Sequence, residues 1–443
     1  MTNTNVPPAF RPPDGVVDIA RTLEQAGFAT WCVGGAVRDA LLGRANLDWD
    51  LATAATPQQV QRLFRRTVPV GIEFGTVGVL DRRGIMHEVT TFRRDVDTDG
   101  RHAVVEFGAS LDEDLARRDL TMNAIAYHPF EHRLHDPFDG RGDLDRRLVR
   151  AVGDARARMR EDRLRVLRAI RFAARFAFDI APETWTAIEE SAPHLGQLSP
   201  ERVKQELQKT MEQVTCPSHA FTRWRAAGVF AALVPALAAV SDTTLLAVDM
   251  IRPPCGAKAA QRLSLRFATL FSELDGVGTA TALRALRFSN AETSWLSALV
   301  DRWYTLHSEL EGLIREQYAT DASMRALTAR IGRLRVAPFV RMAHARWSSA
   351  RTCGNHSPPV PSALETRGVY RVLHHMAFHD AIEVADLAID GDDLRVAGIA
   401  PGPMVGRVLA FLLQQVLATP TLNTRAALLR LAREFADLPP SAS

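Results

Sequence analysis

The sequence predicts an α+β protein, with a small N-terminal head containing a mixed sheet and helices, followed by an all-helical neck, body and tail. Helix and strand patterns alternate over the first ~150 residues, whereas later windows mostly show the 3.6-residue helical period. The 443-residue length is too great for one ordinary core. The composition, 47% hydrophobic and 24% charged, is that of an ordinary globular protein.

The head is expected to consist of short elements in alternation. Apolar spacing predicts, in order, a helix at 16–26, a strand at 29–33, a helix at 37–42, a strand at 47–51 and paired strands at 76–80 and 85–92. Between them, Thr56 is predicted to cap a helix that has Pro57 in its first position. The polar segment 95–100 is expected to be a mobile loop.

Changes in composition divide the chain further. We expect a disordered lead-in at 1–15, a head at 16–147, a helical neck at 148–215, a helical body at 216–350 and a helical tail at 351–443. From Arg141 to Arg175 there are twelve Arg against five Asp or Glu. This excess suits contacts with phosphates, although a solvated helix face of ion pairs would have the same composition.

Several classes of protein are disfavoured. The four Cys residues are far apart and form no CxxC pair, so neither a disulfide framework nor a structural zinc site is expected. The N-terminus lacks a basic region followed by an apolar run, and no apolar stretch is long enough to cross a bilayer. We therefore expect a cytoplasmic protein without a membrane partner. The formal net charge of +3 is weak support for a nucleic-acid partner.

A pair of carboxylates two positions apart indicates a metal site. In a strand, Asp48 and Asp50 of LDWDL would point the same way, and Glu88 could add a third carboxylate from a neighbouring strand. Carboxylates arranged in this way hold Mg²⁺ against a triphosphate, and two such ions would activate a 3′-hydroxyl and stabilise leaving pyrophosphate. Acidic pairs of this spacing are also common on exposed strand edges, so the pair alone is weak support.

A glycine turn precedes the carboxylates by about a dozen residues. Gly34 and Gly35 lie between a strand and a helix, where backbone amides can approach a phosphate. Arg38 lies one helical turn further and could reach the same phosphates. A strand, two glycines, a helix and then DxD on the next strand form a far more specific pattern than any of these features alone.

The string GGAVRDALLGRANLDWDLAT closely resembles the signature of the nucleotidyltransferase branch that contains bacterial and eukaryotic CCA-adding enzymes and bacterial poly(A) polymerases. Similar motifs follow in the family's order: RRDLTMNAIA at 117–126, DPFDGRGDL at 136–144, EDRLRVLRAIRFAARF at 161–176 and SPERVKQELQKTM at 199–211. The resemblance is dense over residues 29–215, and IDGDDLRVAGIAPGPMVGRVL at 389–409 is similar to the tail of bacterial CCA-adding enzymes.

The resemblance implies roles for two groups of residues. It assigns ribose and triphosphate contacts to Arg117, Asp119 and Asn123, beside Arg118, although Asp119 could also cap a helix. It assigns nucleotide selection and binding to the helix that carries the residues Asp162, Arg165 and Arg168.

Hydrogen-bonding chemistry explains how one pair could select two bases. Asp162 and Arg165 are three apart in a predicted helix and would share a face. Asp accepts and Arg donates hydrogen bonds, and cytosine and adenine each present an amino group beside a ring nitrogen acceptor. Uracil and guanine would place a carbonyl against the carboxylate. An intrahelical ion pair without a ligand is the alternative interpretation.

Three related activities share these motifs: complete CCA addition, partial addition of CC or A, and poly(A) addition. The stretch VPVGIEFGTVGVL at 68–80 resembles the form found in CCA-adding enzymes, and the loop within 93–119 is one that CC-adding relatives lack. We therefore expect addition of C, C and A to tRNA from CTP and ATP with two Mg²⁺ ions. An A-only enzyme stays open, as does the oligomeric state.

The alternative of a different class is a non-catalytic RNA-binding protein on the same scaffold. The intact set of carboxylates and the Asp–Arg pair argue against it. One HD pair, His379-Asp380, is reminiscent of metal phosphohydrolases. It lacks a suitably spaced upstream His, so we interpret it as structural.

Overall fold

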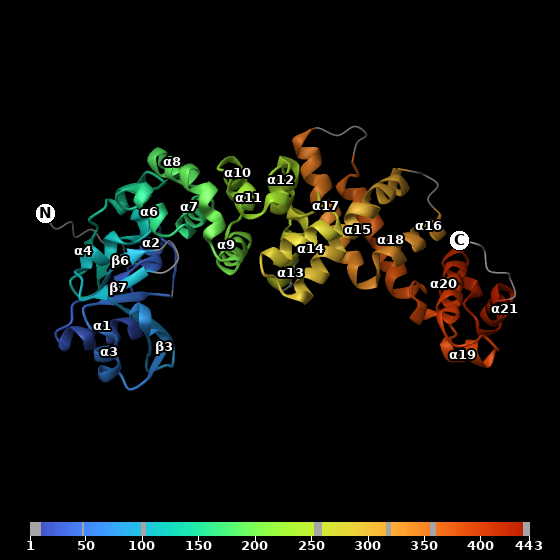
Figure 1. Cartoon of the computed structure of the whole chain (residues 1–443), viewed down its shortest axis with the longest axis horizontal. Coiled ribbons are helices and arrows are strands. Elements are labelled where there is room, and N and C mark those ends of the chain that lie inside the picture. The colour runs from blue at the N-terminus through green and yellow to red at the C-terminus, as the bar shows by residue number, and fades with distance from the viewer. Residues whose placement is uncertain are drawn as a thin grey trace. The chain divides into compact units, whose positions relative to one another are not determined.

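The computed structural model describes residues 10–46, 48–98, 103–251, 259–315, 320–354 and 360–436. The chain forms two compact units, Met1–Ala238 and Ala239–Ser443 (Figure 1). All of the described strands belong to the first unit.

The first unit begins with the head. Its elements are α1 (Asp14–Gln25), β1 (Thr30–Val33), α2 (Gly35–Leu41), β2 (Asp50–Thr53), α3 (Pro57–Leu63), β3 (Thr67–Gly71), η1 (Ile72–Phe74), β4 (Thr76–Leu80), β5 (Met86–Thr91), β6 (Arg93–Thr98), β7 (Ala103–Phe107), α4 (Leu111–Ala116), η2 (Thr121–Asn123), β8 (Ala126–His128), β9 (Arg133–His135) and α5 (Gly140–Asp145).

The helical part of the first unit follows. Its elements are β10 (Leu148–Val149), α6 (Ala155–Glu161), α7 (Leu164–Phe176), β11 (Asp179–Ile180), α8 (Pro182–Ser191), η3 (Ala192–Gln197), α9 (Pro200–Gln213), α10 (Pro217–Ala226), α11 (Val229–Leu233) and η4 (Pro235–Leu237). The sequence predicted a purely helical neck, and this was wrong, because strands β10 and β11 pair in parallel within it.

A mixed seven-stranded sheet organises the head, in the order β3-β4-β5-β2-β1-β8-β9. Strands β2 and β5 are parallel, whereas β1 is antiparallel to both β2 and β8. In this register, Leu51 lies opposite Val89, which places Asp50 and Glu88 one position earlier on adjacent strands. One face of the sheet packs on a core that includes Trp31, Phe92 and Leu115.

Most of the head elements match the predictions. Strands β4 and β5 pair as expected around the turn at 81–84, and Thr56 caps α3 in a capping box with Pro57 at its start. The sequence predicted a disordered lead-in at 1–15, of which residues 1–9 lie outside the described part of the chain. The remainder is ordered: Phe10 is buried against Trp49 and Tyr127, and α1 begins at Asp14.

Two predictions in the head were wrong. Strand β2 begins only at Asp50, so Asp48 precedes the strand instead of lying within it. The segment 95–100 is part of β6 as far as Thr98 and pairs with β7, while residues 99–102 lie outside the described part. The hairpin is anchored by Arg94, which donates to Glu106 at 2.9 Å and 2.8 Å. Cross-strand pairing outweighed the polar composition from which a loop was predicted.

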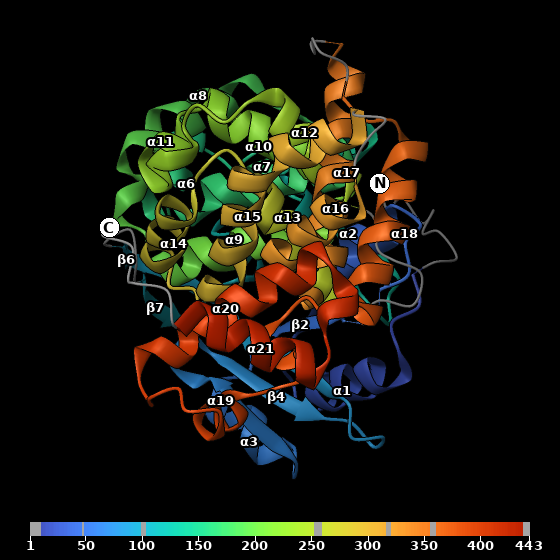
Figure 2. The same ribbon diagram turned by 90° about the vertical axis from the view of Figure 1, so that its right-hand side faces the viewer.

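The second unit is helical throughout its described residues. Its elements are α12 (Asp242–Met250), α13 (Ala259–Leu270), α14 (Gly276–Ala285), α15 (Asn290–Arg315), α16 (Asp321–Ile331), η5 (Arg333–Arg335), α17 (Val336–Cys353), α18 (Ala363–His379), η6 (Val384–Asp386), α19 (Gly391–Val396), α20 (Pro403–Ala418), η7 (Pro420–Leu422) and α21 (Arg425–Ala436). Helices α19, α20 and α21 lie close together (Figure 2). They share an apolar core that includes Leu394, Leu412 and Leu428.

The HD pair of the second unit has a structural role, as predicted. Asp380 accepts a hydrogen bond from Arg325 Nε at 2.7 Å, and Arg325 also donates to the carbonyl oxygen of Leu417 at 2.7 Å. Arg325 therefore joins α16 to the end of α18 and to α20.

Candidate active site

One cavity of about 550 Å³ in the first unit collects nearly all of the candidate residues. This volume lies within the range of nucleotide-sized ligand pockets. Its walls come from the glycine turn, the connection before β2, the segment after α4, and helix α7. The lining residues are Gly34, Gly35, Arg38, Asp39, Asn46, Asp48, Asp50, Arg117, Arg118, Asp119, Asn123, Asp162, Arg165, Arg168, Phe172 and Arg175. Among the predicted site residues, Glu88 alone does not line it.

The carboxylates at the cavity's edge act on one another electrostatically. Burial and the negative charges of Asp48 and Glu88 raise the pKa of Asp50 to about 7, and Arg118 opposes that rise. Asp48 is exposed on the connection before β2. Within the part of the chain that the structure describes, no donor hydrogen-bonds to any of these three carboxylates. A cation would relieve their mutual repulsion.

The oxygen atoms of these carboxylates therefore suit a divalent cation. Among the described residues, no three carboxylate, His or Cys side chains converge closely enough to hold a metal ion. Asp48 lies in the connection before β2, where its backbone nitrogen donates to Asn46 Oδ1 at 2.9 Å, whereas Asp50 is the first residue of the strand. Hard oxygen ligands of this kind suit a divalent cation that is held by one or two carboxylates together with substrate phosphates.

The glycine turn has a conformation that few other residues adopt. Gly34 has φ 77° and ψ −136° and directly precedes α2. A Cβ atom at this position would lie 3.3 Å from Nη1 of Arg118 and 3.7 Å from Oδ2 of Asp50. Glycine thus permits the backbone turn and keeps a side chain out of the space between a cationic and an anionic group of the cavity.

Gly34→Ala is expected to impair both the stability and the activity of the protein. A non-glycine residue in this backbone conformation costs about 1–3 kcal/mol. The added methyl group would also push the Arg118 guanidinium away by a few tenths of an ångström. Urea unfolding measures the first effect and steady-state nucleotide incorporation the second. As a control, Gly196→Ala adds the same methyl group where no atom lies within 4 Å, so an equal loss in both variants would contradict the argument.

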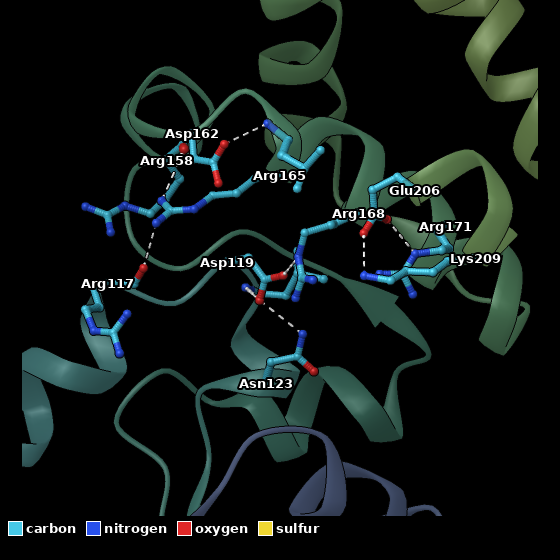
Figure 3. Close-up of polar contacts among 12 residues, drawn as sticks. Arg117, Asp119, Asn123, Arg158, Asp162, Arg165, Arg168, Arg171, Glu206 and Lys209 are labelled. Atoms are coloured by element: carbon cyan, nitrogen blue, oxygen red, sulfur yellow. Dashed lines mark hydrogen bonds and ion pairs between the residues drawn. The ribbon is translucent and has the colours of Figure 1, made fainter. Parts of the chain in front are cut away.

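A chain of hydrogen bonds in the wall of the cavity joins α2, η2 and α7. Arg38 donates to Asn123 Oδ1 at 2.6 Å, and Asn123 donates to Asp119 Oδ1 at 3.1 Å. The other oxygen of Asp119 accepts from Arg168 Nε at 2.7 Å (Figure 3). Burial would raise the pKa of Asp119, but Arg168 and the hydrogen bonds outweigh it and hold that pKa at about 2. Asp119 is therefore a permanent anion, and it does not cap η2.

Two stacked phenylalanines on α7 orient the arginines of this region. Phe172 and Phe176 lie in parallel planes with ring centroids 6.0 Å apart. Three guanidinium carbons lie near the Phe172 ring, at centroid distances of 5.0 Å for Arg38, 5.5 Å for Arg168 and 4.4 Å for Arg171. Cation–π attraction of about 0.5–2 kcal/mol per pair favours these positions.

The two residues predicted to read the base lie differently from the prediction. Helix α6 ends at Glu161 and α7 starts at Leu164, so Asp162 lies in a non-helical connection with φ −144°. The two side chains do not pair with each other. Asp162 accepts from Arg202 at 2.8 Å and from the backbone nitrogen of Leu164 at 3.0 Å.

Arg165 is held by three acceptors instead of by Asp162 (Figure 3). Its guanidinium donates to Glu161 at 2.8 Å and to the carbonyl oxygens of Arg117 at 2.8 Å and Arg158 at 3.2 Å. The intrahelical Asp162–Arg165 ion pair that was the alternative interpretation is thus absent from this described region. Both side chains still line the same cavity.

Sequence reasoning missed the side chains that support these residues. The buried Asp114 accepts from Arg117 at 2.8 Å and from Arg118 at 3.0 Å, and so anchors the segment that enters the cavity. The buried Arg171–Glu206 pair, 2.7 Å apart, ties α7 to α9. Arg202 and Glu206 belong to the quoted SPERVKQEL motif, which was a usable signal, but their partners are 40 and 35 residues distant in the sequence.

Comparison with protein families identifies three segments of the chain. Residues 30–150 match the poly A polymerase head domain, 177–240 the RNA and SrmB-binding site of polymerase A, and 374–432 the tRNA nucleotidyltransferase domain 2. A CCA-adding enzyme of Geobacillus kaustophilus is 34% identical over 420 residues, which cover 94% of this chain and 96% of that protein. The chain belongs to the family of CCA-adding enzymes. It is accordingly a tRNA nucleotidyltransferase.

Other CCA-adding enzymes are similar over part or all of the chain. That of Geobacillus stearothermophilus is 45% identical over 205 residues, 46% of this chain and 50% of that protein. The crystal structure of the Bacillus stearothermophilus CCA-adding enzyme in complex with CTP is 30% identical with a TM-score of 0.70, covering 97% of this chain and 98% of that one. Nucleotidyltransferases of this family generally use a divalent metal ion.

More distant CCA-adding enzymes share the fold. The Thermotoga maritima enzyme complexed with tRNA is 20% identical, with a TM-score of 0.65 and 96% coverage of each chain. No helix among the described residues has the length and apolar character needed to span a membrane.

Proposed function

We propose that this CCA-adding enzyme adds C, C and A to tRNA 3′ ends from CTP and ATP, and that the cavity of the first unit is where each transfer occurs. The observation that carries the proposal is the meeting, in one cavity, of the carboxylates of β2 and its preceding connection, the glycine turn, and the Asp162 and Arg165 side chains. In each transfer, the tRNA 3′-oxygen bonds to the α-phosphorus, the bond to the β-phosphate oxygen breaks, and pyrophosphate leaves.

The chain's own residues would bind the nucleotide at three points. The backbone at Gly34 and Gly35 would receive the triphosphate. The Arg38 guanidinium is buried and forms an ion pair with Asp39 at 2.7 Å, so it would hold this turn in place and add positive charge beside the phosphates. Arg117, Asp119 and Asn123 would surround the ribose, with the Asp119 charge fixed by Arg168. Because Arg38 and Asn123 are hydrogen-bonded to each other, the triphosphate and ribose sites would be positioned as one unit.

Asp48 and Asp50 would hold Mg²⁺, with Glu88 acting on Asp50 from the adjacent strand. We propose two ions, which when bound would lower the pKa of the 3′-hydroxyl and neutralise charge on the leaving pyrophosphate.

Asp162 and Arg165 would select the base. The connection at Asp162 interrupts the helix, so its carboxylate is directed by Arg202 and by the start of α7 instead of by a helical face. Arg165 donates three hydrogen bonds to protein acceptors. A guanidinium has five N–H groups, so donors are left for a ring nitrogen of the base. A cytosine or adenine edge would satisfy both residues, whereas uracil or guanine would leave buried groups unpaired.

Product sequencing tests the proposed activity. The substrate is a tRNA ending at the discriminator base, incubated with CTP, ATP and Mg²⁺, alone and together. We expect CC with CTP alone, CCA with both nucleotides, and no further growth. Addition of A only to tRNA already ending in CC would identify an A-adding enzyme, long A tracts a poly(A) polymerase, and no addition a non-catalytic binding protein.

A further inference from the structure

A second, smaller cavity lies in the neck between α6, the start of α7, and α8. Its volume is about 190 Å³, and it shares no lining residue with the catalytic cavity. Its polar lining residues are Arg156, Arg160, Arg163, Glu190, Ser191 and His194. It is smaller than the usual 300–1,000 Å³ range of small-molecule pockets, and no aromatic ring other than the imidazole lines it. The size and lining suit one phosphate group better than a whole nucleotide.

The charges around this cavity are unbalanced. Glu190 is the one acidic residue that lines the cavity. It forms a bidentate ion pair with Arg156 at 2.7 Å and 2.8 Å, and its charge also acts on Arg160. Asp154, at the start of α6, also acts on Arg156 and Arg160. Arg160 makes no ion pair among the described residues, and its remaining hydrogen bond is to the carbonyl oxygen of Arg156 at 3.3 Å.

Arg163 is the residue that most clearly lacks a counterion. Its Nη1 donates to Ser191 Oγ at 2.6 Å, but its Nε is buried and has no hydrogen-bond partner among the described residues. Burial and the positive charge of Arg160 lower the pKa of Arg163. A buried N–H group of a charged side chain destabilises the protein when it has no hydrogen-bond acceptor. An anion placed between Arg160 and Arg163 would supply one.

We propose that this neck cavity, formed by Arg156, Arg160 and Arg163, binds a backbone phosphate of the tRNA substrate. The inference rests on the proposed function, because it needs an RNA that reaches the catalytic cavity. Arg163 follows Asp162 directly, and consecutive Cα atoms are 3.8 Å apart. A phosphate held by Arg163 therefore fixes the RNA strand against the same short connection that carries the base-selecting carboxylate.

The test measures tRNA affinity without any nucleotide, by fluorescence anisotropy over a series of salt concentrations. The variant R160Q/R163Q removes two charges from the cavity, and R160Q alone alters only an exposed side chain. The matched control is R62Q/R65Q, which removes two charges from exposed arginines of the head that line neither cavity. Thermal unfolding checks that all variants are folded.

We expect about fivefold to tenfold weaker tRNA binding by R160Q/R163Q, a smaller loss in R160Q, and a salt slope reduced by about one phosphate contact. A neutral methylphosphonate linkage at one acceptor-strand position should weaken wild-type binding and leave the double variant unaffected. A Kd and slope equal to those of R62Q/R65Q would overturn the proposal. A second result would also overturn it: inorganic phosphate stabilises the wild type and not R160Q/R163Q, while both bind tRNA with the same affinity. That result would indicate a site for free phosphate.

The two proposals fail separately. If the wild type binds tRNA but adds no nucleotide, the proposed function is wrong, whatever the neck variants do. If the wild type adds CCA and R160Q/R163Q binds tRNA as tightly as the control, only the neck site is wrong.

Discussion

Asp50→Asn is expected to abolish nucleotide addition and, in the absence of divalent metal, to stabilise the fold. The amide keeps the size of the side chain but removes the charge that would bind the cation. Loss of a metal-binding carboxylate should lower the rate by on the order of 10³-fold or more, since the metal supplies several kcal/mol of transition-state stabilisation. Single-turnover incorporation of CTP measures the loss, and tRNA affinity should change little.

The stabilisation follows from the raised pKa of Asp50, about 7 against an ordinary value of 3.8. Near pH 4 the Asp50 carboxyl is protonated in the folded protein and only partly ionised in the unfolded chain. At this pH it therefore lowers the free energy of unfolding only slightly. As the pH rises to 7, the unfolded chain loses the proton and the folded protein retains it, so stability falls. Above pH 7 the carboxyl is ionised in both states, and the loss of unfolding free energy reaches its full value, on the order of 1–3 kcal/mol for a partly exposed group.

Urea unfolding in EDTA at pH 5 and pH 8 measures this effect. The D50N variant should exceed the wild type in unfolding free energy at pH 8, and the difference should shrink at pH 5. Asp48→Asn is the matched control, because Asp48 is exposed. It should lose activity with a smaller gain in stability. A D50N variant that retains normal turnover with Mg²⁺ would contradict the metal assignment, and one that is less stable than the wild type at pH 8 would contradict the raised pKa of Asp50.

Asp162→Ala is expected to change which nucleotide enters, beyond slowing the reaction. Without the carboxylate, the amino group of cytosine or adenine loses its acceptor, and the carbonyl of uracil or guanine no longer meets a negative charge. One unpaired buried group costs about 1–3 kcal/mol, so discrimination against UTP and GTP should fall roughly 5- to 150-fold. The measurement is single-turnover incorporation of each of the four nucleotides separately.

The structure supplies the control that the sequence could not. Arg202→Ala removes the ion-pair partner of Asp162 and leaves the carboxylate in place. It should slow incorporation through poorer positioning, with selection against UTP and GTP largely kept. Equal losses for all four nucleotides in Asp162→Ala, or the same loss of selection in both variants, would show that Asp162 acts through structure alone.

The sequence predicted the site through short-range patterns. Gly34, Asp50 and Asp162 lie within motifs whose order resembles that of the family, and the cavity contains all three. The sequence also predicted a third carboxylate, Glu88, on a neighbouring strand. The parallel pairing of β2 with β5 places Glu88 beside Asp50, as predicted. Periodicity and motif spacing carry this information because each depends on residues close in sequence.

The sequence could not predict how distant side chains redirect these residues. Asp162 was placed on a helix because EDRLR has helical spacing, but hydrogen bonding to the Leu164 nitrogen and to Arg202 favours a break between α6 and α7. The strand at 47–51 was shortened because Asn46 binds Asp39, Asp48 and Trp49, holding the connection away from the sheet. Both outcomes depend on partners that local patterns do not identify.

The boundary between the two compact units has a consequence for biosynthesis. Every residue of the catalytic cavity lies between Gly34 and Arg175, and the first unit ends at Ala238. Domains generally fold as units, beginning at the N-terminus while the ribosome is still translating. The nascent chain can therefore assemble a nucleotide-sized cavity before most of residues 239–443 are made, so cellular CTP and ATP could act as early ligands that stabilise the emerging unit.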